Sequence, residues 1–94
     1  MARVTTTREE VERTLQMAEY QWERLPEVED TIDNWDQLDQ ILFIEEWPLE
    51  EQRLKRLREF ADKGALDKEQ QARYEQLECT IARNRPIIQR LQNS

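Results

Sequence analysis

The residues that most often carry out catalysis are scarce in this chain. It has no histidine, a single cysteine (Cys79) and a single glycine (Gly64). Without histidine, the chain lacks the commonest general base and metal ligand, and it cannot form a Ser-His or Cys-His nucleophile. One glycine cannot build a glycine-rich phosphate-binding loop. The sequence therefore predicts a protein that is not an enzyme and has no metal or cofactor site, with Cys79 as an incidental surface thiol.

Clustered acids are the remaining candidates for chemistry. Glu45 and Glu46 are adjacent, but neighbours on a helix diverge by about 100° and do not converge on one substrate atom. Asp33, Asp36 and Asp39 recur every three residues, whereas a calcium-binding loop places its first ligands two residues apart. We therefore expect these carboxylates to form a solvated acidic ridge on a helix.

The charge of the chain is segregated along the sequence. Residues 25–52, here called the acidic segment, contain ten acids and no Lys or Arg. The rest of the chain contains 11 acids and 14 basic residues. The formal net charge of −7 therefore originates in this segment. A concentration of one charge steers the encounter with an oppositely charged partner. The alternative is that basic helices of the same domain neutralise the segment, because paired charged faces are common in helical proteins.

Large aromatic residues accompany these acids. Trp22 and Trp35 fall on regular apolar stripes and are expected in the core, whereas Phe43 and Trp47 are candidates for surface anchors because they flank an expected helix break. Trp47 could equally pack beneath Pro48 as a structural plug. The residues predicted to bind a partner are Asp33, Asp36, Asp39, Phe43, Glu45, Glu46 and Trp47.

These features favour a non-enzymatic interaction or assembly module that docks on a basic surface of a larger protein. One alternative is a nucleic-acid-mimicking inhibitor or antitoxin-like regulator, in which carboxylates replace phosphates. Another is a structural dimerisation unit. Direct nucleic-acid binding is disfavoured by the net charge of −7, and the arginines around residues 53–58 and 83–90 are expected to face the acidic segment.

Composition gives the broad class. A chain of 94 residues with 37% apolar residues, one Gly and three Pro fits one all-α domain. The longest apolar run, residues 41–44, is far short of the roughly 20 residues of a membrane span. With a lone cysteine and no signal-peptide pattern, the sequence indicates a cytoplasmic protein.

Caps and apolar periodicity predict a small bundle of about four helices, preceded by a disordered tail over residues 1–6. The first helix begins at Thr7 and should end before Pro26, and Trp47-Pro48 should separate the next two. Gly64 should close the third helix and Asp67, with Gln70, should cap the fourth. The predicted ranges are 7–25, 27–46, 48–63 and 67–91, of which the last two form an antiparallel helical hairpin.

Two apolar features predict self-association. The stripe from Tyr74 to Leu91 continues for nearly three heptads, and residues 41–44 point in all directions around a helix. Together they offer more apolar surface than one small core needs, which usually marks an interface. We expect a symmetric homodimer, the commonest closed assembly.

Overall fold

The computed structural model describes residues 7–93, and their regular structure is entirely helical. The elements are α1 (Thr7–Glu23), α2 (Leu25–Thr31), the short 3-10 helix η1 (Ile32–Asn34), α3 (Gln37–Asp62) and α4 (Lys68–Asn93). The prediction of an all-α protein is confirmed. The tail predicted for residues 1–6 lies outside the described residues.

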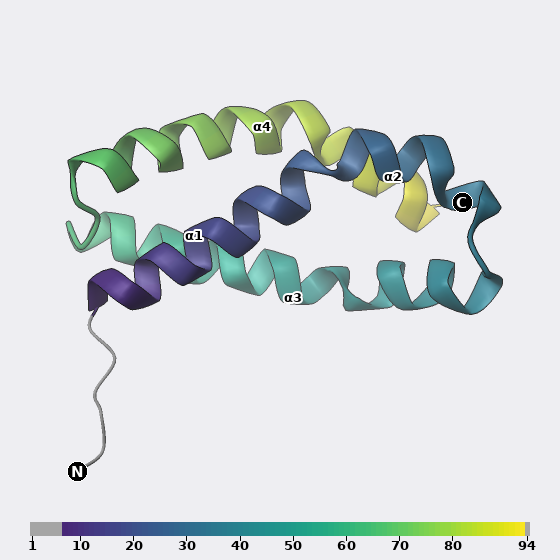
Figure 1. Ribbon diagram of the computed structural model, residues 1–94, viewed down its shortest axis with the longest axis horizontal. Coiled ribbons are helices and arrows are strands. Elements are labelled where there is room, and N and C mark those ends of the chain that lie inside the picture. Colours follow the sequence, from purple (N-terminus) through teal and green to yellow (C-terminus); the bar gives the residue numbers. More distant parts are fainter. Residues whose placement is uncertain (1–6, 94) are drawn as a thin grey trace, which may run out of the picture.

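Helix α1 packs against both of the long helices, and α2 continues from it alongside the C-terminal part of α4 (Figure 1). The Cα positions extend over 44 × 34 × 17 Å. Because packed helix axes lie about 8–10 Å apart, the smallest of these dimensions leaves room for about two layers of helices. The long helices therefore have faces that no other described helix covers.

The proline at residue 26 does not separate two long helices as predicted. Pro26 lies in the first turn of the short helix α2, which follows α1 after Arg24 alone. Proline is tolerated there because the first turn has no partner for its missing N–H. The main interruption comes later, where Trp35 and Asp36 adopt extended backbone angles before α3. The predicted helix over residues 27–46 is therefore wrong.

The predicted break at Trp47-Pro48 is also wrong, because α3 continues through both residues. Proline inside a helix removes one backbone hydrogen bond and clashes with the preceding turn. Here the Pro48 ring is exposed, whereas three other side chains of the same helix are buried: Trp47, Leu54 and Leu57. The burial of these side chains outweighs the local cost of the proline.

The connection between α3 and α4 follows the predicted local motifs. Gly64 has a φ of 69°, the left-handed conformation that suits glycine after a helix. The Gln70 backbone N–H donates to the Asp67 carboxylate at 2.8 Å, and the Asp67 N–H donates to the Gln70 side-chain oxygen at 3.1 Å. This reciprocal capping box was predicted from the two residue types and their spacing.

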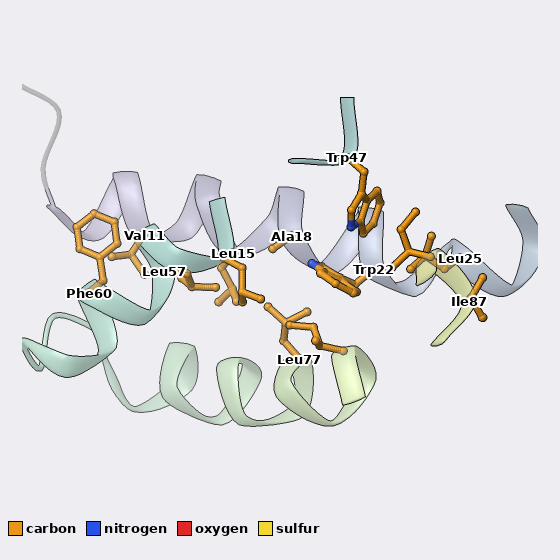
Figure 2. Packing of buried hydrophobic residues seen from close by; sticks show 13 residues of the cluster. Val11, Leu15, Ala18, Trp22, Leu25, Trp47, Leu57, Phe60, Leu77 and Ile87 are labelled. Atoms are coloured by element: carbon orange, nitrogen blue, oxygen red, sulfur yellow. The ribbon is translucent and has the colours of Figure 1, made fainter. Parts of the chain in front are cut away.

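One hydrophobic cluster joins α1, α3 and α4 (Figure 2). It includes Trp22 and Trp47, whose rings meet edge to face with centroids 5.0 Å apart. The α4 stripe predicted for self-association faces this core, since Leu77, Ile81 and Ile88 are buried. Of the two features that predicted a dimer, only the region around residues 41–44 leaves large apolar side chains exposed.

Candidate docking surface

Part of the acidic segment is neutralised within the domain. Carboxylates of three residues of the segment form ion pairs with arginines: Glu29 with Arg90 at 2.6 Å, Glu50 with Arg53 at 2.6 Å and Glu51 with Arg85 at 2.7 Å. Arg85 and Arg90 belong to α4, as the sequence suggested.

The other seven acids of the segment are exposed and form no ion pair with any residue between 7 and 93. They are Glu27, Asp30, Asp33, Asp36, Asp39, Glu45 and Glu46. Asp33 lies in η1, Asp36 precedes α3, and Asp39 lies in the first turn of α3. They do not follow one another on a single helix, so the predicted continuous ridge is wrong, although their exposure is confirmed.

Most other arginines are engaged elsewhere. Arg56 pairs with Glu10 at 2.8 Å and Arg58 with Glu78 at 3.3 Å. Arg73 of α4 reaches across to α1, where it contacts Glu12 at 2.7 Å and Glu19 at 2.6 Å. Because these side chains already have carboxylate partners, they do not neutralise the acids of the segment.

Trp47 is more buried than a surface anchor would be, and Trp35 is less buried than a core residue would be. Trp47 is only 2% exposed and belongs to the core, so it does not serve as a surface anchor. Trp35, predicted in the core, is half-buried, and its indole N–H donates to the Thr31 hydroxyl at 3.3 Å. The sequence held a signal for Trp47, because Phe43, Trp47, Glu50, Leu54 and Leu57 recur at spacings of 4, 3, 4 and 3.

Phe43 lies between these two tryptophans. Its ring centroid is 5.6 Å from that of Trp35 and 5.7 Å from that of Trp47. The Arg24 guanidinium lies 5.7 Å from the same centroid, within the range of a cation–π contact. Phe43 is therefore half-buried and offers only part of its ring to a partner.

Exposed apolar side chains on α3 extend on both sides of the run at residues 41–44, further than the sequence predicted. The helix predicted over residues 27–46 would place Leu38 and Leu42 on one apolar face with Trp35, but in the structure they are 60% and 42% exposed. Ile41 and Leu49 are 43% and 57% exposed. We call these four residues the outer stripe. The signal that could have revealed the stripe was the 4-3-4-3 spacing from Phe43 to Leu57, because it identifies the buried face on the other side of α3.

A small cavity lies on the other side of α3. It has a volume of about 130 Å³ and is lined by Gln21, Arg24, Phe43, Glu46, Trp47 and Glu50. Charges of both signs line it, which favours no single class of ligand.

Within residues 7–93, no group of three or more acidic or thiol side chains is arranged to hold a metal ion. No helix in the same range has the length and apolar composition needed to cross a membrane.

Arg73 links α1 to α4 and perturbs the titration of Glu12. Hydrogen bonds from Arg73 and then from Gln70 stabilise the charged carboxylate, so the pKa of Glu12 lies below its usual 4.5. Because the pKa is lowered in the folded state, the contribution of Glu12 to stability is present above about pH 4.5 and is lost as the pH falls through the folded pKa.

Glu12→Gln should therefore reduce the free energy of unfolding at pH 7 and make it fall less steeply under acid conditions. Chemical denaturation at several pH values from neutral to acid measures both effects. Glu75→Gln is a matched control, because Glu75 is exposed on α4 and forms no ion pair with a described residue. Equal pH profiles for the Glu12 variant and the unmodified chain would contradict the prediction.

No family model matches this chain, and neither the curated proteins nor the solved structures with which it was compared include a match.

Proposed function

We propose that this protein is a non-enzymatic interaction module that docks on a basic surface of a larger protein. The observation that carries the proposal is the set of seven exposed acids in the acidic segment without an ion-pair partner among residues 7–93. Unpaired exposed charge of one sign accelerates association with a partner of the opposite sign. Cys79 is a lone exposed thiol, which suits the reducing cytoplasm.

The charges that steer the partner are those of Asp33, Asp36, Asp39, Glu45 and Glu46. All five are exposed, and Asp36 makes no side-chain capping bond to α3. Their carboxylates form no ion pair with a described residue and are therefore available to a partner. Phe43 contributes a half-buried ring beside them, while Trp47 supports this region from the core.

The test combines capture from the native host with charge variants. Bait carrying Asp33→Asn, Asp36→Asn and Asp39→Asn should recover the partner more weakly than the unmodified chain, most clearly at low salt. Asp36 and Asp39 lie near the start of α3, where each negative charge stabilises a helix by roughly 0.3–1 kcal/mol. Thermal unfolding of the variant should therefore show only a small loss of stability.

A control variant and a cross-linking experiment complete this test. A bait with Glu69→Gln and Glu75→Gln changes exposed acids of α4 and should recover the partner normally. Cross-linking should place basic residues of the partner next to the acidic segment. Displacement of the partner by DNA or RNA would favour the nucleic-acid-mimicking inhibitor, and capture that is insensitive to the triple change would reject docking through these acids.

A further inference from the structure

The outer stripe forms an apolar ridge within the face of α3 that points away from the core. Leu38, Leu42, Glu45 and Leu49 succeed one another at spacings of 4, 3 and 4, which place them on one line along a helix. Trp47, which is buried, follows Leu38 by nine positions along the helix, so the two side chains point in opposite directions. From Leu38 to Leu49 the ridge is about 16 Å long, at 1.5 Å per residue.

Charge is distributed unequally around this ridge. Asp39 and Glu46 are seven residues apart and therefore share one flank, and Glu45 lies within the ridge itself. The opposite flank carries the uncharged Gln37 and Pro48. All three acids are exposed and unpaired within residues 7–93. A partner that covers the leucines must therefore also meet a row of negative charge.

A second copy of the chain fits this ridge poorly. If two α3 helices pair antiparallel with Leu42 opposite Leu42, the numbers of opposed residues sum to 84. Asp39 then faces Glu45, and Leu38 faces Glu46. Moving the register to bring acids near the basic end of α3 places leucines against Gln52 and Arg56, and Arg56 already pairs with Glu10. Charge complementarity thus favours a basic partner.

We infer that the outer stripe of α3 binds an amphipathic helix whose apolar side chains cover Leu38, Leu42 and Leu49 and whose Lys or Arg side chains meet Asp39, Glu45 and Glu46. This inference rests on the proposed function and specifies the partner's chemistry. The two helices pack side by side, with the leucines providing most of the affinity. The carboxylates provide selectivity for a basic sequence and the rate of encounter.

The test uses a synthetic helical peptide of three heptads, with leucines along one face and lysines on both flanks. Titration calorimetry with the full chain should show binding that weakens as salt is added. The same peptide with glutamates in place of the lysines should bind at least roughly tenfold more weakly. A lysine peptide in which serines replace the leucines should lose most of its affinity, and amide NMR shifts should concentrate on residues 38–49.

Leu42→Ser should weaken binding by roughly tenfold or more, equivalent to about 1.4 kcal/mol. Met17→Ser is the matched control, because Met17 of α1 is 44% exposed and Leu42 is 42% exposed. It should leave the affinity unchanged.

Asp39→Asn with Glu46→Gln should reduce the affinity several-fold at low salt and little at high salt. Circular dichroism should show an unaltered helical spectrum for each variant, since all the changed side chains are exposed.

The outcomes separate this inference from the proposed function. If the charge variant weakens binding and Leu42→Ser does not, docking on a basic partner stands and the helix-binding ridge is rejected. If the lysine and glutamate peptides bind equally, both proposals are rejected. A mass of twice 11.5 kDa by light scattering, abolished by Leu42→Ser, would make a second copy the occupant and overturn the inference. Failure of the lysine peptide to bind at millimolar concentration would overturn it as well.

Discussion

Trp47→Ala is expected to lower the free energy of unfolding by about 3–5 kcal/mol, the range typical of buried aromatic residues truncated to alanine. Trp47 is 2% exposed, and its ring meets that of Trp22 at 5.0 Å between centroids. Truncation would therefore leave a cavity between α1 and α3. A domain of this length has a total stability of only roughly 5–14 kcal/mol, so the variant should be partly unfolded at moderate temperature. Urea denaturation followed by circular dichroism measures the loss.

Two other substitutions act as controls for Trp47→Ala. Trp35→Ala should cost less than about 1.5 kcal/mol, because Trp35 is only half-buried and its N–H donates to a threonine hydroxyl at the surface. Trp47→Phe should also cost less than Trp47→Ala. It retains an aromatic ring and removes a buried indole N–H that has no acceptor among residues 7–93. A larger loss for Trp35→Ala than for Trp47→Ala would show that Trp35, and not Trp47, anchors the core.

Asn84→Ala is expected to destabilise the fold by about 1–3 kcal/mol, the cost of leaving a buried polar group without a hydrogen bond. The Asn84 side-chain amide donates to the Trp22 backbone carbonyl at 2.9 Å. In a continuous helix, this carbonyl would accept from the N–H of residue 26. Residue 26 is a proline and has no N–H. Asn84, which is 4% exposed, therefore replaces the donor that Pro26 lacks.

A double-mutant cycle tests this replacement directly. Pro26→Ala restores an N–H to residue 26, so Asn84→Ala should cost about 1 kcal/mol less in that background. Pro48→Ala is the control background, because Pro48 is an exposed proline within α3 rather than at the α1–α2 junction. It should leave the cost of Asn84→Ala unchanged. An equal cost in all three backgrounds would mean that Asn84 stabilises the fold by packing and not through the Trp22 carbonyl.

The same contact explains the buried asparagine on α4. From the sequence, Asn84 occupies a position of the apolar stripe, where a polar residue can fix the register of packed helices at a cost in stability. The structure identifies its partner as a backbone carbonyl of α1 rather than a residue of a second chain. Asn84 thus contributes to the packing of α4 against α1.

Local sequence determined the features whose hydrogen bonds close within a few residues. The glycine turn at Gly64 and the capping box of Asp67 and Gln70 were predicted because each satisfies its own backbone groups without help from distant residues. The helical character of α1 and α4 was predicted for a related reason. Along each helix, apolar side chains recur at intervals of three and four residues.

Tertiary structure decided whether a local helix-ending residue ended its helix, and which face of each helix became buried. Pro48 is a local reason to end a helix, but burial of Trp47 and Leu54 on another face keeps α3 continuous. The choice of carboxylates for each arginine was also set by packing, because α1 and α2 bring Glu29, but not Asp33, to α4. The exposure of Leu38 and Leu42 followed from the same packing. Periodicity identifies two apolar faces of α3 around residue 42. Packing against the other helices decides which of these two faces is buried.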